Sequence, residues 1–110
     1  MKTIMKNLNK EEEFYELIQK DQVHVFVFSA NWCPDCLYIK PFIPDIIMKY
    51  ASYEFVYVDR DQFLDLCIDQ NIFGIPSFVV TKKGNELGRF VSKDRKTQKE
   101  IEEFLDHLKV

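Results

Sequence analysis

Two cysteines separated by two residues, Cys33 and Cys36, are the side chains of this sequence best suited to chemistry, and they lie in the run Trp-Cys-Pro-Asp-Cys at 32–36. Two thiols at this spacing exchange two electrons by opening and closing a disulfide, without a cofactor. The same spacing also supplies half of many zinc sites. The context favours a redox pair, because the cysteines follow the apolar run 23–28 and open a segment with helical spacing. We therefore expect Cys33 at a helix N-terminus, where unpaired backbone N–H groups and the helix dipole stabilise a thiolate.

Other side chains with chemical potential have simpler interpretations. A metal site would need further ligands, but His24 begins an expected core strand and His107 lies on the expected last helix, so no metal is predicted. Cys67 falls on the apolar face of a short helix and is interpreted as a buried structural thiol rather than a regulatory thiol or third metal ligand. Trp32 stands beside the first cysteine, and we expect it to be a partly exposed platform for substrate rather than a core residue.

The composition predicts one packed globular domain over residues 1–110. Hydrophobic residues make up 46% and aromatic residues 15% of the chain, which argues against disorder. The net charge of −3 does not suggest nucleic-acid binding, and the basic cluster Lys93, Arg95, Lys96 and Lys99 is interpreted as a solvated helix start. No leader pattern or membrane-spanning run is seen. Three cysteines, an odd number, fit a reducing compartment, and we expect a cytoplasmic location without a membrane partner.

The first half of the chain predicts a strand between two helices. Asn9 and Glu12 form a capping-box pattern for the first helix. The run 23–28 is almost continuously apolar, as expected for a central, parallel strand covered on both faces. The helix that follows from Cys33 contains Pro41 and Pro44, and it should therefore be kinked at 40–44. A short edge strand is also expected at 3–5.

The second half predicts strands at 54–58, 77–81 and 86–91, the last two joined by a hairpin turn at 82–85. Between the first two strands, Asp59 with Gln62 should cap a short helix. Thr97 with Glu100 forms a second capping box, which starts a terminal helix. The expected fold class is therefore α/β, with a central mixed sheet of four or five strands and helices on both of its faces.

This order of elements, with Trp-Cys-x-x-Cys between a strand and its helix, resembles the thioredoxin superfamily along nearly the whole chain. Gly-Ile-Pro-Ser-Phe at 74–78 lies just before the hairpin, where the family carries a cis-proline beside its dithiol. Pro41 follows Cys33 by eight residues, where the family's active-site helix is kinked. The Pro-Asp pair between the cysteines resembles a thioredoxin-related branch rather than standard thioredoxins, which have Gly-Pro there.

The resemblance implies a role for each motif. Cys33 would attack a disulfide and Cys36, one turn further on, would release the product. Ile75 with a cis Pro76 would form the backbone edge along which the substrate lies. We also expect the residues around the cysteines, Trp32, Pro34 and Asp35, to contact substrate.

Several family features are missing. The buried acid beneath the family's dithiol aligns with Val27, and the lysine that accompanies it aligns with Phe55. Ser29 replaces a tryptophan at the strand end, and no glycine follows the last strand. Asp35 is one alternative base for the resolving thiol, but a first-turn Asp is more often a helix-dipole partner. Its charge should also make the dithiol slightly more reducing.

The resulting hypothesis is a monomeric thiol-disulfide oxidoreductase that reduces protein or small-molecule disulfides without a cofactor. A reductase drawing on NADPH, or another thiol system, would regenerate the dithiol. Two alternatives stay open at this point. The protein is either a general reductant or the dedicated partner of one peroxidase or reductase, and a non-catalytic binding or redox-sensing module of the same fold is the alternative outside enzymes.

Overall fold

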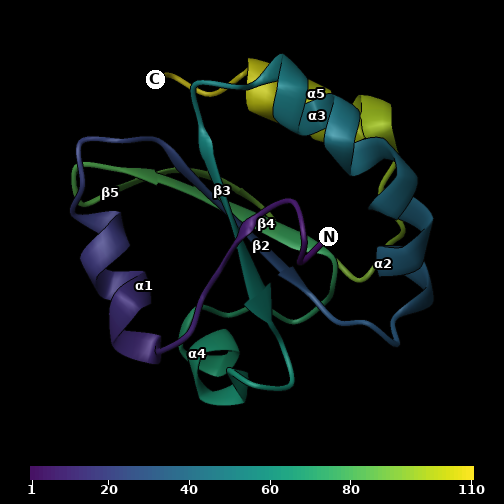
Figure 1. Cartoon of the computed structure of the whole chain (residues 1–110), viewed down its shortest axis with the longest axis horizontal. Coiled ribbons are helices and arrows are strands. Elements are labelled where there is room, and N and C mark those ends of the chain that lie inside the picture. The colour runs from purple at the N-terminus through teal and green to yellow at the C-terminus, as the bar shows by residue number, and fades with distance from the viewer.

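A computed structural model describes residues 1–110 and contains one five-stranded mixed sheet in the order β1-β3-β2-β4-β5. Helices α2, α3 and α5 lie on one side of the sheet and α1 and α4 on the other (Figure 1). The elements are β1 (Lys6–Asn7), α1 (Glu11–Ile18), β2 (His24–Ser29), α2 (Pro34–Ile39), η1 (Lys40–Phe42), α3 (Ile43–Lys49), β3 (Glu54–Asp59), α4 (Leu64–Asp69), β4 (Ser77–Lys82), β5 (Asn85–Phe90) and α5 (Gln98–Asp106). The predicted fold class is confirmed.

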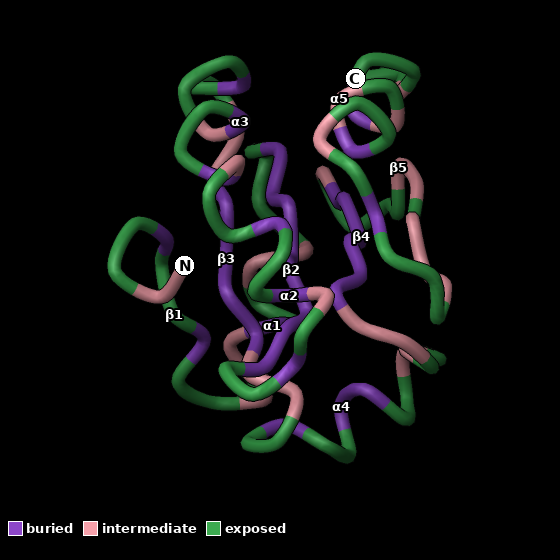
Figure 2. The backbone as a smooth tube through the Cα atoms, turned by 90° about the vertical axis from the view of Figure 1, so that its right-hand side faces the viewer, coloured by how far each residue is buried: buried purple, intermediate pink, exposed green.

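Strand β2 is the centre of the molecule, and all six of its residues are buried. Successive side chains of a strand point to opposite faces, so β2 supplies two cores. Val25 and Val27 pack with the isoleucines of α2 and α3, whereas Phe26 and Phe28 pack with Phe14 of α1. Figure 2 shows this buried strand between its equally buried neighbours β3 and β4. The prediction of a central strand is confirmed, but β2 is parallel only to β3 and antiparallel to β4.

The prolines break the helix after the dithiol into three pieces, as predicted. Helix α2 ends at Ile39, a 3-10 turn covers Lys40–Phe42, and α3 begins at Ile43. Pro41 lies in the 3-10 turn and Pro44 in the first turn of α3, where its missing N–H leaves no hydrogen bond unmade. The kink lets α2 begin at the end of β2 while α3 stays packed on the sheet.

The β4–β5 hairpin is also confirmed, and the backbone of its turn explains why a glycine occurs there. Lys83 and Gly84 have φ values of 52° and 81°. Two consecutive residues with positive φ define the turn type that matches the twist of antiparallel strands. Glycine adopts this backbone without a steric penalty.

Three predicted boundaries are wrong by a few residues. The edge strand is Lys6–Asn7 rather than 3–5, because it is this pair that is in register with Val56 and Tyr57 of β3. The N-cap of helix α1 is Lys10, one residue after the expected Asn9, so the carboxylate that accepts from the Asn9 backbone N–H is that of Glu13 and not of Glu12.

The third shift concerns α4, which begins at Leu64. The Asp59 carboxylate accepts hydrogen bonds from the backbone N–H groups of Asp61 and Gln62, and so closes a turn that precedes the helix instead of capping it. No helix has the length and apolarity needed to cross a bilayer.

The capping box of α5 is present as predicted and gives a stability test. The Thr97 hydroxyl accepts from the Glu100 N–H at 3.2 Å, and the Glu100 carboxylate accepts from the Thr97 N–H at 2.9 Å. Thr97→Ala should lower the free energy of unfolding by about 1 kcal/mol, because it removes the acceptor for one helix-end N–H. Urea titration would measure the change. Lys99→Ala, at an exposed position of the same turn, is the control and should change it by less than about 0.5 kcal/mol; equal losses would contradict the capping role.

Candidate active site

Cys33 lies where β2 ends and α2 begins, as predicted. It is the N-cap of α2, and its sulfur accepts a hydrogen bond from the Cys36 backbone N–H at 3.3 Å. The residue is 5% exposed, and its thiol is 3.8 Å from the carbonyl oxygen of Ile75. The Cys33 sulfur thus lies between the Cys36 backbone N–H and the loop that carries Ile75.

Cys36 lies one helical turn further on and is 1% exposed. Burial is the main reason that its pKa is raised to about 12, and the neighbouring Cys33 thiol adds to the effect. The Ser29 side chain and the Ala30 backbone N–H act in the opposite direction. Both cysteines are free in this structure, so it describes the dithiol form. The two thiols are therefore chemically different, although only two residues separate them.

The loop before β4 faces the dithiol, and the Ile75–Pro76 peptide bond in it is cis. Gly74 brings this loop against the connection between β5 and α5. A Cβ at position 74 would lie 2.2 Å from the carbonyl oxygen of Ser92, so no other residue fits without moving the backbone. Pro76 is buried at the base of the loop, and the Ile75 carbonyl is the part that reaches Cys33.

A groove of about 360 Å³ opens above Cys33. Its lining residues are Trp32, Cys33, Arg60, Ile72, Phe73, Gly74, Ile75 and Lys93. Trp32 and Phe73 are 58% and 61% exposed. Large aromatic side chains are more often buried than this. The Trp32 indole donates to the Asp61 carboxylate at 2.6 Å, and the Arg60 guanidinium lies 5.8 Å from its ring. The groove therefore combines two apolar platforms with two cations.

The structure brings some of the predicted site residues into this groove and not others. Trp32, Cys33 and Ile75 line it, whereas Pro34, Asp35 and Pro76 do not. Sequence reasoning missed Phe73, Arg60 and Lys93. A signal existed only for Phe73, whose place directly before the Gly-Ile-Pro motif sets it beside the dithiol.

Asp35 points away from the groove and is paired with Arg95. The Arg95 Nε donates to the Asp35 carboxylate at 2.9 Å, and its guanidinium lies 4.4 Å from the centre of the Tyr38 ring. This pair links the first turn of α2 to the connection between β5 and α5. The charge that the sequence places beside the cysteines is thus largely neutralised within the protein.

The interpretation of the basic cluster as a solvated helix start is wrong for one member. Lys96 is 1% exposed, and its ammonium donates to the carbonyl oxygens of Ser92 and Asp94 at 3.2 and 3.1 Å. Burial lowers the pKa of Lys96, while the charges of Asp94, Asp35 and Cys36 oppose that effect. The two carbonyl acceptors and the stacking of the ammonium over the Phe90 ring compensate for burial.

Apolar core side chains occupy the two positions at which the family carries its buried acid and the accompanying lysine. Val27 is fully buried, with Tyr57 and Phe78 as its partners on the neighbouring strands. Phe55 is in register with Val25 and is also buried. The sheet beneath the dithiol therefore carries no carboxylate at this place.

Cys67 and the histidines lie apart from the groove. Cys67 is buried between α4 and the sheet, which raises its pKa to about 11. His24 is buried in β2, with its Nδ1 bonded to the Gln22 carbonyl oxygen, and His107 lies at the end of α5. No group of three or more His, Cys, Asp and Glu side chains has an arrangement that could hold a metal ion.

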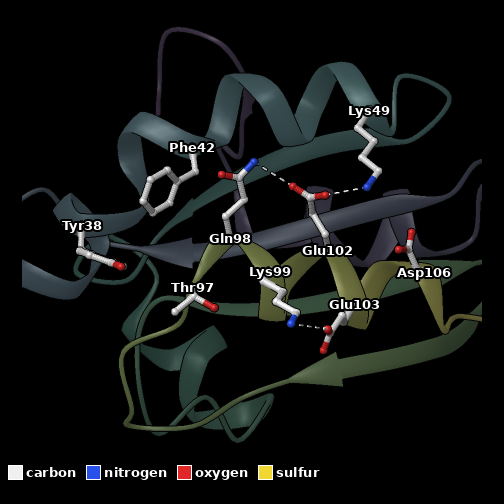
Figure 3. Close-up of a pocket in the computed structure, with 9 residues that line it drawn as sticks. All are labelled: Tyr38, Phe42, Lys49, Thr97, Gln98, Lys99, Glu102, Glu103 and Asp106. Atoms are coloured by element: carbon white, nitrogen blue, oxygen red, sulfur yellow. Dashed lines mark hydrogen bonds and ion pairs between the residues drawn. The ribbon is translucent and has the colours of Figure 1, made fainter.

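A larger hollow of about 580 Å³ lies between α5 and the α2–α3 segment (Figure 3). Most of its charged side chains are paired within the hollow. The Glu102 carboxylate accepts from Lys49 and from Gln98, and Lys99 pairs with Glu103. It contains no cysteine or histidine. We interpret it as the surface where two helices meet, with no part in thiol chemistry.

Comparison with known proteins gives one consistent result. The thioredoxin family model matches residues 5–107. Mitochondrial thioredoxin-2 of Schizosaccharomyces pombe is 34% identical over 97 residues, which are 86% of this chain and 73% of that protein. Thioredoxin of Rattus norvegicus is 34% identical over 104 residues, or 92% and 99% of the two chains. The X-ray structure of Fasciola hepatica thioredoxin has a TM-score of 0.81 at 27% identity, and covers 96% of this chain and all of its own. Oxidised mitochondrial thioredoxin 3 of Saccharomyces cerevisiae has a TM-score of 0.81 at 27% identity, over 94% and 96% of the two chains.

The burial of Cys36 and Cys67 predicts unequal thiol reactivity. With pKa values of about 12 and 11, fewer than about one thiol in a thousand is ionised at pH 7.5, and both residues are shielded from solvent. Iodoacetamide should therefore modify Cys33 well before either of them in the folded, reduced protein. Timed alkylation with peptide mass mapping would measure the three rates. Labelling of Cys67 as fast as Cys33 would show that Cys67 is accessible.

The Asp35–Arg95 pair makes opposite predictions for its two members. Removing the carboxylate with Asp35→Asn should raise the reduction potential of the dithiol, and Arg95→Gln should lower it, because the uncompensated carboxylate then disfavours thiolates. Each shift should be roughly 5–20 mV, since exposed pairs contribute about 0.2–1 kcal/mol. Glutathione redox titration measures both. The double variant is the control and should lie near the wild type; single variants that move the potential in the same direction would contradict the pairing.

Proposed function

The chain belongs to the thioredoxin family and is a thiol-disulfide oxidoreductase, and we propose that Cys33 attacks the disulfide of a substrate while Cys36 releases the product. The observation that carries this assignment is the asymmetry of the two thiols. Cys33 lines the groove, whereas Cys36 does not, is 1% exposed and has a raised pKa. Only a sulfur that is already bonded to Cys33 is within reach of Cys36.

The exchange takes place in two steps that conserve electrons. The Cys33 thiolate attacks one sulfur of the substrate disulfide, a mixed disulfide forms, and the other substrate sulfur leaves as a thiolate. The Cys36 thiolate then attacks the Cys33 sulfur, so that a Cys33–Cys36 disulfide forms and the second substrate sulfur leaves. The substrate gains two electrons and the protein loses two. A reductase drawing on NADPH, or another thiol system, returns them.

The groove supports extended peptides as substrates. Pro76 has no backbone N–H, and the Ile75 carbonyl oxygen lies beside the Cys33 sulfur, so an extended chain can pair with this edge while its sulfur meets Cys33. Trp32 and Phe73 offer stacking surfaces on either side, and Arg60 and Lys93 favour acidic groups near the disulfide. Pro34 and Asp35 would contact substrates only at the rim, since Asp35 is engaged by Arg95.

We also propose the oligomeric state, the location and the partners of the protein. One sheet from Lys6 to Phe90, with helices packed on both of its faces, supports a single domain over 1–110, and we propose that it acts as a monomer. An odd number of cysteines supports a reducing compartment such as the cytoplasm. The mildly negative charge favours neither nucleic acid nor a membrane surface as a partner. Disulfide-bearing proteins, small disulfides and the regenerating reductase are the proposed partners.

Variants at the two cysteines test the proposed roles. Cys36→Ser should retain a stable mixed disulfide with substrates, because Cys33 still attacks and nothing within reach releases the product. Cys33→Ser should lose both turnover and trapping. Insulin disulfide reduction measures turnover, and elution of immobilised variants with dithiothreitol after passage of a lysate measures trapping. Equal capture by the two variants would overturn the assignment. Strong trapping by Cys36→Ser together with weak insulin reduction by the wild type would indicate a dedicated partner rather than a general reductant.

A further inference from the structure

The hydroxyl of Ser29 is buried and has no hydrogen-bond partner. Ser29 is the last residue of β2 and is 0% exposed. A buried polar group without a partner is costly, and such groups in native proteins usually have a functional explanation. Only one other side-chain group in the molecule, the hydroxyl of Thr81 in β4, is in the same condition.

Ser29 lies on the side of the sheet that carries the resolving thiol, and the next residue, Ala30, packs with Cys36. Side chains two residues apart on a strand share a face, so Ser29 faces the same side of the sheet as Val27, the side that α2 covers. Tyr57 is the register partner of Val27 on β3. The hydroxyl makes no hydrogen bond to Cys36 or Tyr57 in this structure, but Ser29 lowers the pKa of both groups against the larger, opposite effect of their burial.

A small cavity of about 150 Å³ connects this place with the surface. Cys36, Ala30 and Tyr57 form its inner wall, and the exposed residues Asn31, Leu37 and Lys40 form its outer wall. A cavity of this size admits water. Cys36 therefore lies beside a route to solvent that is separate from the substrate groove.

The resolving step creates a need for such a route. Cys36 must lose its proton before it attacks Cys33, and the residue at the position of the family's buried acid is Val27. Resting on the roles proposed above for the two cysteines, we propose that the Ser29 hydroxyl donates to the Cys36 sulfur as its thiolate forms, and that the proton leaves through the adjacent cavity past Tyr57. Ser29 is thus a positioning residue for the second half of the reaction.

The chemistry of the step balances without another reactant. The Cys36 S–H bond breaks and its proton passes to solvent water in the cavity. The resulting thiolate displaces the substrate thiolate from Cys33, and that thiolate takes up a proton from solvent after release. Ser29 keeps its own proton and gains a hydrogen-bond acceptor when the Cys36 thiolate forms, because an uncharged hydroxyl in this position is a donor and not a base.

The titratable groups around Cys36 define the background for a pH experiment. Cys33 and Asp35 belong to the same turn, Tyr57 faces the cavity from β3, and Lys96 approaches from the connection before α5. Lys40 and Met1 also line the cavity, and burial lowers the pKa of the Met1 amino group. Beyond Tyr57, Lys2 and Asp59 contribute charges of opposite sign. In the mixed disulfide Cys33 no longer titrates, so the remaining groups are the same in the wild type and in a Ser29 variant.

The test separates the two halves of the reaction. One equivalent of 5,5′-dithiobis(2-nitrobenzoate) releases a first thionitrobenzoate when Cys33 attacks and a second when Cys36 resolves the mixed disulfide. Stopped-flow absorbance from pH 6 to 9 follows both phases. In Ser29→Ala the second phase should be about tenfold slower at each pH, a displacement of its pH profile by about one unit, equivalent to about 1.4 kcal/mol. The first phase should change by less than about twofold.

The controls make each result decisive. Thr81→Val removes the other unpartnered buried hydroxyl from the same sheet and should leave both phases as in the wild type. A Ser29→Ala second phase with the wild-type rate and pH profile would overturn the proposal, and so would a Thr81→Val protein that is slowed as much. Cys36→Ser tests the underlying roles separately, because it should release a single thionitrobenzoate; release of two with wild-type kinetics would refute the assignment of the resolving thiol whatever Ser29 does.

Discussion

The burial of β2 on both faces is the constraint on which the site depends. A strand with no solvent-facing side is fixed in direction and in register, because any slip would exchange the two sets of core side chains. The residue that follows such a strand is therefore held as firmly as the core itself. Cys33 follows after a short turn, and its sulfur is held by the N–H of Cys36 at the start of α2. A reactive group on a mobile loop would not gain this support.

Much of this arrangement could be predicted from the sequence, because local patterns and tertiary packing agree. The apolar run of β2, the kink at Pro41 and Pro44, the hairpin at Lys83–Gly84 and the capping box of α5 are each specified by residues close together in the chain. The boundaries that differ, at β1, α1 and α4, involve a choice between start positions a few residues apart. Propensity alone does not make that choice, since the register with β3 and the packing of Phe14 and Leu66 decide it.

The details of the site were less predictable, since they depend on tertiary contacts that local sequence patterns do not specify. Arg95 meets Asp35 across 60 residues, and Ser29 meets Cys36 only because α2 folds back over the end of β2. Lys96 is the clearest case. Its charge suggests a surface position, but its aliphatic chain fills a core position while its ammonium is bonded to two carbonyl groups of its own loop.

The close approach of Gly74 to Ser92 has a mechanical consequence for recognition. The loop that carries Ile75 and the connection that carries Lys93 touch backbone to backbone, with no side chain between them to rotate or compress. These two segments therefore form one continuous wall of the groove, and Trp32 belongs to the other wall. Substitution of Phe73 or Lys93 on this wall can alter which peptides bind without changing the distance between the Ile75 carbonyl oxygen and the Cys33 sulfur. Selectivity and reactivity are thereby open to independent change in this protein.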